Sequence, residues 1–332
     1  MASYIGRRKF LAALGGTAVA WPLAARAQQG ERMRTIGVLN ALATDAPEGV
    51  ARLAAFVQGL QQLGWTEGRN VRIETRWAAD SDHLRRYAAE LVALAPDVIL
   101  ASGGTVVGPL LQATRTVPIV FTLAIDPVGG GWVDSLAQPG RNATGFTSYE
   151  YSLTAKWLEL LKEIAPGVTR VAVLRDANSP QGVGQFAVLQ SVASTLSVEL
   201  RPLDVSDPGE IERGITAFTQ TPNGGLIVTG SSWAFVHRDL IIALAARHRL
   251  PAVYFQHHFV AGGGLISYAP DDIEPHRRAA GYVDRILRGE KPADLPVQAS
   301  TKYRLAINLK AAKALGLEVP PTLLARADEV IE

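Results

Sequence analysis

Short runs of aliphatic and β-branched residues alternate with longer segments of helical period along the chain from residue 35. Residues 35–39 (TIGVL) predict a buried strand, and residues 48–63 follow with apolar side chains on one helical face. In the rest of this half, the same patterns predict strands at residues 71–77, 97–101, 118–122 and 143–146, and helices at residues 83–95, 105–114 and 128–136.

The same alternation restarts near residue 153. The patterns there predict strands at residues 170–174, 198–203, 225–229, 251–255, 264–268 and 305–307, and helices at residues 153–164, 184–196, 211–219, 236–247, 275–287 and 309–315. Strands that alternate with helices of this length indicate parallel sheets with right-handed crossovers. We therefore expect an α/β fold.

Two stretches far apart in the chain have the same plan. Residues 97–105 (DVILASGGT) and 224–232 (GGLIVTGSS) each run from a strand into a turn of Gly, Ser and Thr, and a helix and a strand that begins at proline follow both. Without its first 27 residues, the chain of about 305 residues is also near the upper limit for a single core. We expect two Rossmann-like lobes with parallel sheets, joined by a hinge near residues 148–152. The predicted boundaries are residues 28–148 plus about 270–305 for lobe 1, and 149–269 plus about 306–332 for lobe 2.

The first 27 residues have the layout of an export signal. Arg7, Arg8 and Lys9 form a basic region, an apolar stretch follows, and Ala25-Arg26-Ala27 provides a small-residue cleavage site. The apolar stretch is too short to span a bilayer. The paired arginines before Phe-Leu resemble a twin-arginine (Tat) signal, with an ordinary Sec signal as the alternative. We expect cleavage after Ala27 and a periplasmic mature protein.

Composition and charge exclude several function classes. The chain has no cysteine, so it has no disulfide, no lipid anchor at cysteine and no thiolate nucleophile or metal ligand. The signal holds four basic residues and no acid, and its removal changes the net charge from +2 to −2. Without a basic excess the mature protein is not expected to bind nucleic acid. No feature implies a cofactor or a metal.

Small polar residues gather in the loops that follow the predicted strands, where open α/β sheets bind ligands. The turn at residues 102–105 is the clearest case, because its glycines let a ligand approach the backbone and Thr105 is placed to cap the next helix. A plain strand-to-helix turn uses the same residues. The candidate ligand-binding residues are Asn40, Thr44, Ser102, Gly103, Gly104, Thr105, Thr122, Asp126, Tyr149, Asn178, Ser179, Ser231, Ser232, Trp233 and Tyr268.

Four of these candidates also have a structural interpretation. Asp126 either binds a ligand amine or caps the following helix, and Trp233 lies either in a cleft or on a lobe surface. Tyr149 and Tyr268 either stack on a ligand or pack the hinge. The sequence alone leaves these alternatives open.

Catalytic signatures are missing from the chain. It has no G-x-S-x-G, no phosphate-binding G-x-x-x-x-G-K-[ST], no H-E-x-x-H and no G-x-G-x-x-G after the first strand. His257 and His258 are the only adjacent histidines, and on a strand they point apart, which makes them poor joint metal ligands. We therefore expect a binding protein and not an enzyme.

Several segments, taken together and in order, resemble one family. They are VPIVF at 117–121, DPV at 126–128, PGRNATG at 139–145, KWLELL at 156–161, IN at 307–308, ALG at 314–316 and ARADE at 325–329. The chain resembles the substrate-binding proteins of ABC transporters, typified by receptors for tryptophan and other aromatic amino acids. The resemblance implies the type I periplasmic binding fold, in which a cleft closes on a small solute.

The resemblance also implies partners. We expect a monomer that delivers a small carboxylate-bearing solute, an amino acid or an aromatic acid, to an ABC permease in the inner membrane. The alternatives are a module that presents its ligand to a membrane sensor and, less favoured, an exported enzyme.

Overall fold

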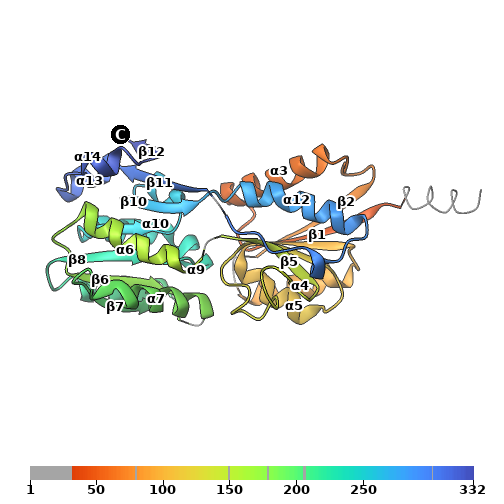
Figure 1. The fold of residues 1–332 in the computed structure, drawn as a ribbon, viewed down its shortest axis with the longest axis horizontal. Coiled ribbons are helices and arrows are strands. Elements are labelled where there is room, and N and C mark those ends of the chain that lie inside the picture. The colour runs from red at the N-terminus through yellow and green to blue at the C-terminus, as the bar shows by residue number, and fades with distance from the viewer. Residues whose placement is uncertain (1–31, 79–80, 149, 178, 205–206, 301) are drawn as a thin grey trace, which may run out of the picture.

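The computed structural model describes residues 32–78, 81–148, 150–177, 179–204, 207–300 and 302–332. The expected signal peptide at residues 1–27 and the candidate residues Tyr149 and Asn178 lie outside these ranges. Two α/β lobes lie next to each other along the long axis of the molecule (Figure 1).

The first lobe is built on a five-stranded, wholly parallel sheet of order β2-β1-β3-β4-β5. Its strands are β1 (Arg34–Asn40), β2 (Val71–Trp77), β3 (Val98–Ser102), β4 (Ile119–Ala124) and β5 (Ala143–Thr147). Its helices are α3 (Pro47–Gln62), α4 (Ser81–Ala93), η1 (Gly104–Val106), α5 (Val107–Ala113) and, from much later in the chain, α12 (Glu274–Leu287).

The second lobe is built on a seven-stranded sheet of order β12-β11-β10-β9-β8-β6-β7. Its strands are β6 (Arg170–Arg175), β7 (Glu199–Asp204), β8 (Gly224–Val228), β9 (Ala252–Tyr254), β10 (Ile266–Pro270), β11 (Tyr303–Asn308) and β12 (Glu329–Ile331). Most pairs are parallel, as the sequence pattern predicts, but β10 and β11 pair antiparallel, which it does not predict.

Helices cover both faces of the second sheet (Figure 1). They are α6 (Ser152–Ile164), α7 (Pro180–Ala193), α8 (Pro208–Phe218), α9 (Ser232–Val236), α10 (Arg238–Arg247), α11 (His257–Ala261), α13 (Leu309–Leu315) and α14 (Pro321–Leu324). A short 3-10 helix, η2 (Pro292–Asp294), lies beside β5 in the first lobe.

Three sequence predictions about local structure are wrong. Residues 128–136 form turns and not a helix, because Gly131 has a left-handed φ of 67° and Asp126 Oδ1 accepts a hydrogen bond from Gly129 N (2.7 Å). The helix predicted at residues 236–247 begins earlier and is interrupted at His237. His257 and His258 begin helix α11 and are not in a strand.

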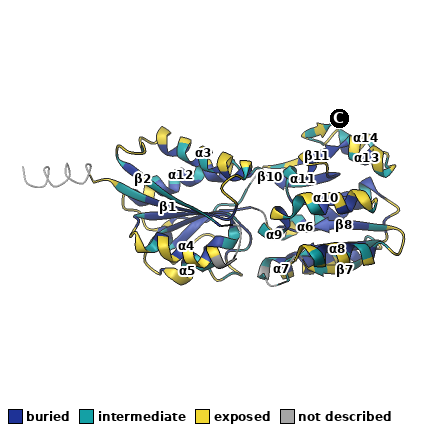
Figure 2. Cartoon of the chain, turned by 180° about the vertical axis from the view of Figure 1, so that it is seen from behind, coloured by how far each residue is buried: buried dark blue, intermediate teal, exposed yellow. Residues whose placement is uncertain are grey.

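The buried residues follow the strands (Figure 2). In the first sheet, Ile36 and Val38 face the layer of α3 and α12, while Leu39 and Ile99 face the layer of α4 and α5. Helices α3 and α12 approach closely at Gly59, where an added Cβ would lie 2.8 Å from Ala280 Cβ. This contact ties a late segment of the chain to the first lobe.

The chain passes between the lobes three times, after β5, between β10 and α12, and between η2 and β11 (Figure 1). Trp157 of α6 is fully buried beside one of these passages, and its Nε1 donates a hydrogen bond to Tyr268 O (2.8 Å). The carboxyl ends of the parallel strands of both sheets therefore face the region between the lobes.

Candidate ligand-binding cleft

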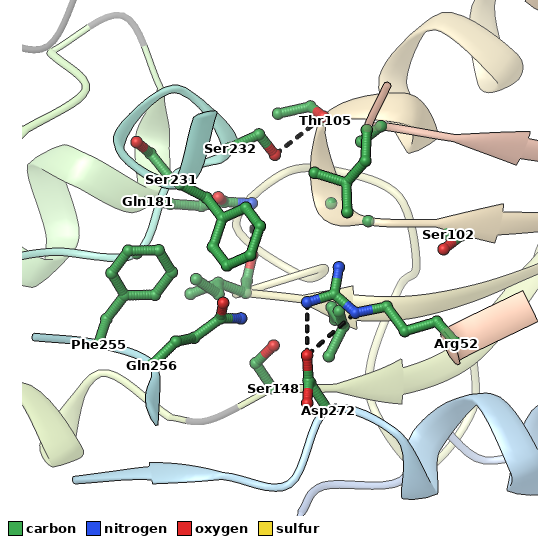
Figure 3. A pocket seen from close by; sticks show the side chains of 18 of the residues that line it. Arg52, Ser102, Thr105, Ser148, Gln181, Ser231, Ser232, Phe255, Gln256 and Asp272 are labelled. Carbon is green, nitrogen blue, oxygen red and sulfur yellow. Dashed lines mark hydrogen bonds and ion pairs between the residues drawn. The ribbon is translucent and has the colours of Figure 1, made fainter. Parts of the chain in front are cut away.

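A pocket lies between the two lobes, at the carboxyl ends of their parallel strands (Figure 3). Both lobes and the passage after β10 contribute to its wall. The lining residues are Ala41, Leu42, Arg52, Ser102, Gly103, Gly104, Thr105, Leu123, Ile125, Ser148, Gln181, Gly230, Ser231, Ser232, Phe235, Phe255, Gln256, Pro270 and Asp272.

The first lobe contributes the turn that follows β3. Gly103 has a φ of 114°, and an added Cβ there would lie 2.9 Å from Ala41 Cβ, so only glycine fits without strain. Thr105 does not cap the following helix, as the sequence suggested, because the N-cap position of η1 is Gly103 and no side chain caps it. The Thr105 hydroxyl instead lies 3.2 Å from Ser232 Oγ of the other lobe.

The second lobe contributes the matching turn after β8 and the residues after β9. Ser231 is the N-cap of α9, because its Oγ accepts a hydrogen bond from Ala234 N (2.9 Å). This leaves Ser232 free to face Thr105. Phe235 and Phe255 add apolar surface, and Gln256 precedes α11.

A buried ion pair forms the charged corner of the pocket. Arg52, in helix α3, donates through Nε (3.0 Å) and Nη2 (2.5 Å) to Asp272 Oδ2, and both side chains are almost completely buried. His258 Nε2 lies 3.0 Å from the same oxygen. Burial raises the pKa of Asp272, but the Arg52 guanidinium and His258 outweigh that effect and hold the pKa well below its usual value.

His276 connects this corner to the Gly-rich turn. Its Nδ1 donates a hydrogen bond to Asp272 O (2.8 Å), which leaves Nε2 as the acceptor. Nε2 lies 2.9 Å from both Ser102 Oγ and Thr122 Oγ1. Complete burial, with a smaller contribution from Arg52, lowers the pKa of His276 to about 3, so the ring is neutral at physiological pH.

Further contacts cross the cleft. Arg238 of α10 forms an ion pair with Glu48 of α3 (3.0 Å), and Gln181 Nε2 donates to Ile125 O (2.9 Å). Two guanidinium groups lie over the Phe235 ring, with Arg52 Cζ 5.5 Å and Arg238 Cζ 4.9 Å from its centroid. With the Thr105–Ser232 contact, these interactions show the lobes in a closed arrangement.

Six of the predicted residues come together in the pocket wall: Ser102, Gly103, Gly104, Thr105, Ser231 and Ser232. Asn40 and Thr122 are buried behind it. Asn40 Oδ1 accepts from Leu42 N (3.1 Å), and Thr122 contacts His276. Thr44 is exposed on the loop after β1 and does not line the pocket.

The remaining described candidates have structural partners outside the pocket wall. Asp126 accepts hydrogen bonds from Gly129 N and from Tyr151 OH (3.0 Å), and Ser179 is the N-cap of α7. The Trp233 ring stacks on His237 at 6.1 Å, and the Tyr268 ring lies 5.6 Å from Tyr303.

Sequence reasoning missed Arg52, Gln181, Phe235, Phe255, Gln256 and Asp272. One of them had a visible signal. Arg52 is spaced four residues before Phe56 and eight before Leu60, so it lies on the buried face of α3. A charged residue in an apolar helical stripe is rarely left unpaired. Nothing local marks Asp272 or Gln256.

His257, His258 and Asp272 could in principle share a metal ion, since each offers a ligand atom within 4.8 Å of the others. The two imidazole rings are 3.9 Å apart, which the predicted strand would not allow. However, Asp272 Oδ2 already accepts two hydrogen bonds from the Arg52 guanidinium, whose positive charge repels a cation. The geometry therefore favours an ion-pair network over a metal centre.

The fold and the cleft define a two-lobed binding protein of the type I periplasmic class. A model of the family "ABC transporter substrate binding protein" matches residues 36–331, so the chain belongs to that family. Within the described ranges, no helix combines the length and apolar character needed to cross a membrane.

Known proteins place the chain among solute receptors. It is 24% identical over 270 residues to a tyrosine-binding protein of Clostridioides difficile strain R20291, which covers 79% of this chain and 76% of the relative. A conserved domain protein of Vibrio cholerae is 26% identical with a TM-score of 0.84. A Streptococcus pneumoniae ABC domain in complex with L-Trp is 23% identical with a TM-score of 0.83. Both of these solved structures match 90% of this chain over 100% of their own length.

Proposed function

We propose that this chain is a periplasmic receptor that holds a small carboxylate-bearing solute, an amino acid or an aromatic acid, between its lobes. It acts as a monomer and delivers the solute to an ABC permease in the inner membrane. The observation that carries the proposal is the guanidinium of Arg52 in the wall of the cleft.

Arg52 has a donor to spare. Two of its nitrogens are bonded to Asp272, while Nη1 has no hydrogen-bond acceptor among the residues that the structure describes. A buried guanidinium edge favours an anionic oxygen, because charge-assisted hydrogen bonds are about twice as strong as neutral ones. Hydroxyl groups of Ser231 and Ser232 offer further donors along the same wall, whereas the Ser102 hydroxyl donates to His276 Nε2.

The apolar part of the wall supports a solute with a hydrophobic body. Phe235 and Phe255 line the pocket, and rings of this kind stack on aromatic ligands at centroid distances of about 4.5–7 Å. A tyrosine-binding relative and a similar structure in complex with L-Trp agree with this class of solute.

Closure of the lobes supports the transport role. Thr105–Ser232 and Glu48–Arg238 link the lobes on two sides of the pocket, so a solute that bridges them favours the closed form. A permease distinguishes loaded from empty receptor by that difference in shape.

A melting-temperature screen of the purified protein against amino acids, aromatic acids, sugars and nucleosides tests the proposal. A solute at 100 times its Kd adds about 2.7 kcal/mol to the free energy of unfolding. We expect the melting temperature to rise with carboxylate-bearing solutes, and Arg52→Lys to weaken that rise because lysine lacks the guanidinium fork. A rise with sugars or nucleosides alone would contradict the proposed solute class.

Cell uptake tests delivery to an importer. Deletion of the gene should abolish high-affinity uptake of the labelled solute. Unchanged uptake, together with loss of a transcriptional response to the solute, would instead identify a sensor module. Chemical change of the solute on incubation with the protein would identify an enzyme.

A further inference from the structure

The second lobe contains a cavity that is separate from the cleft. Its volume is about 320 Å³, and none of the residues that line it also lines the cleft. The wall comes from helices α10 and α13 of the second lobe (Figure 1), from the end of β9 and from the segment between α11 and β10. Most of it is apolar and includes Ile242, Leu250, Leu265 and Leu315.

Tyr254, the last residue of β9, is a polar residue that the fold fixes in this wall. It is 1% exposed, and the Phe259 ring stacks on its ring at 4.9 Å between centroids and 17° between planes. An added Cβ at Gly264 would lie 2.5 Å from Tyr254 Cε2, so the glycine backbone packs directly against the edge of the ring. Because both neighbours are in close contact, the ring cannot turn and carry its hydroxyl elsewhere.

The Tyr254 hydroxyl has no hydrogen-bond partner among the residues that the structure describes. A buried tyrosine hydroxyl usually has one, since it can both donate and accept. Burial raises the pKa of Tyr254 above its usual value, so the hydroxyl keeps its proton at physiological pH and remains a donor. A molecule that brings an acceptor oxygen into the cavity would satisfy this donor.

The other polar residues of the wall indicate that this molecule is neutral. Asn308 is the N-cap of α13, because its Oδ1 accepts from Ala311 N (3.0 Å) and its Nδ2 donates to Val260 O (3.3 Å). Lys310 is the one charged residue among the described residues of the wall, and it is exposed to solvent. A charged group in the apolar interior would lose its hydration without gaining a buried partner of opposite charge.

We propose that this cavity is a second ligand site, for a small, mostly apolar, neutral molecule with an oxygen that accepts a hydrogen bond from Tyr254. The volume lies within the range of small-molecule sites, about 300–1,000 Å³, and exceeds that of an apolar cavity of about 150 Å³ that holds benzene. The site goes beyond the proposed function, because it needs neither Arg52 nor closure of the lobes.

Two one-ring probes of nearly the same shape test the role of the hydroxyl. Acetophenone carries a carbonyl oxygen, and ethylbenzene has a methylene group in its place. Calorimetric titration of the purified protein measures both affinities. We expect acetophenone to bind about 2- to 10-fold more tightly than ethylbenzene, the range that one neutral hydrogen bond gives.

Tyr254→Phe removes the hydroxyl and keeps the ring. The preference for acetophenone should disappear, while ethylbenzene should bind as before. Because the hydroxyl has no partner, this variant should keep or raise the melting temperature. Tyr282→Phe in the first lobe is the matched control, since that hydroxyl donates to Pro296 O and accepts from Gln298 Nε2. Its loss should lower the melting temperature and leave the preference between the probes unchanged.

Ala311→Leu locates the site. Ala311 lines the cavity from α13, and the larger side chain should fill part of the volume and weaken both probes by about 10-fold. Ala243→Leu is the matched control on α10. Ala243 is exposed and does not line the cavity, so this variant should bind both probes as the unmodified protein does.

The results can overturn the proposal at each step. Equal affinities of the two probes, or an unchanged preference in Tyr254→Phe, would show that the hydroxyl recognises no acceptor. Unchanged binding in Ala311→Leu would place the probes outside this cavity. Equal falls in melting temperature for Tyr254→Phe and Tyr282→Phe would show that the Tyr254 hydroxyl already has a partner. No binding of either probe up to the limit of its solubility would overturn the site itself.

Discussion

The two sides of the cleft are built in different ways. On one side, turns at residues 102–105 and 230–232 face each other with glycines and hydroxyls, each fixed by its own strand and by the helix that follows. The other side is formed by charged residues from distant parts of the chain, namely Arg52, His258 and Asp272. Arg52 and Asp272 are 220 residues apart in the sequence. The turn side is neutral and local, and the other side is charged and assembled only in the folded protein.

This difference separates the stability of the cleft from its chemistry. A turn that is fixed locally tolerates the loss of a single hydroxyl, because strand pairing holds the backbone of both turns and the Ser231 N-cap also holds the second. A buried ion pair cannot lose one partner without leaving the other charge in a medium of low polarity. We therefore expect substitutions in the charged corner to have larger effects than substitutions in the turns.

Arg52→Met should have the largest effect. It leaves Asp272 buried with His258 as its remaining ion-pair partner, and breaking a buried pair in this way costs about 3–5 kcal/mol of unfolding free energy. Urea denaturation measures the loss. The exposed pair Arg247–Glu212 supplies the control, since Arg247→Met should cost less than about 1 kcal/mol.

The double variant Arg52→Met with Asp272→Leu sharpens the test. Removal of both charges should recover much of the lost stability while abolishing ligand binding, because the penalty comes from an uncompensated charge. If Arg52→Met and Arg247→Met lost the same unfolding free energy, the buried ion pair would contribute no more stability than an exposed one.

His276 should give the second largest effect, as a dependence on pH. Its pKa in the folded protein is lowered to about 3, so between about pH 6.5 and pH 3 the unfolded chain binds a proton that the folded chain rejects. The titration of His276 therefore costs no unfolding free energy above pH 6.5. Below that pH the unfolding free energy falls, by about 2 to 3 kcal/mol at pH 4.5. Asp272 adds almost nothing to the loss at pH 4.5 and above, because its contribution starts to fall only when the unfolded carboxyl takes up a proton, near its ordinary pKa of 3.8.

Denaturation of the unmodified protein and of His276→Gln at pH 7.0, 5.5 and 4.5 isolates this contribution. Glutamine cannot take up the proton, so the variant should be less stable at pH 7 but should lose less stability on acidification. Parallel curves would mean that another group is responsible for the acid sensitivity.

Gly103→Ala should have an intermediate effect on the turn side. The new Cβ would meet Ala41 Cβ at 2.9 Å in a backbone conformation with φ of 114°, which costs about 1–2 kcal/mol. Gly104→Ala is the matched control, since φ there is not left-handed and the nearest atom to an added Cβ is Leu123 O at 3.4 Å. We expect a lower melting temperature for the first variant and, for the second, reduced ligand affinity with little change in melting temperature.

The same division explains how far the sequence alone leads. Periodicity predicted the two α/β lobes, because strands such as 71–77 and helices such as 309–315 carry their signal within a few residues. The turn residues Ser102 and Ser231 were found because ligands bind at strand ends in this class of fold.

Other features depend on distant contacts. Asp272 enters the pocket because α12 returns to the first lobe and packs on α3, which no local pattern encodes. The argument that His257 and His258 point apart used strand geometry, because a five-residue helix such as α11 is too short to show a period. The helix predicted at residues 128–136 is wrong because the glycines at residues 129–131 oppose helix formation, and turns form there instead.

The contact between Thr105 and Ser232 should give the smallest effect, because a single neutral hydrogen bond contributes about 0.5–1.5 kcal/mol. Thr105→Val and Ser232→Ala should each weaken ligand binding by up to about 10-fold. Since both groups are needed for one contact, the double variant should bind no more weakly than the worse single variant. Titration of the unmodified protein, the two single variants and the double variant with the same ligand gives the coupling free energy between Thr105 and Ser232.

Ser231→Ala is the control within the same turn. It removes the N-cap of α9 and should lower the unfolding free energy by about 1 kcal/mol without coupling to Thr105→Val. Coupling at Ser232 but not at Ser231 would show that the hydroxyls of adjacent residues have separate roles, one in closing the cleft and one in holding its backbone. Additive effects at Ser232 would instead mean that the turns only shape the cleft, and that the charged side alone governs closure.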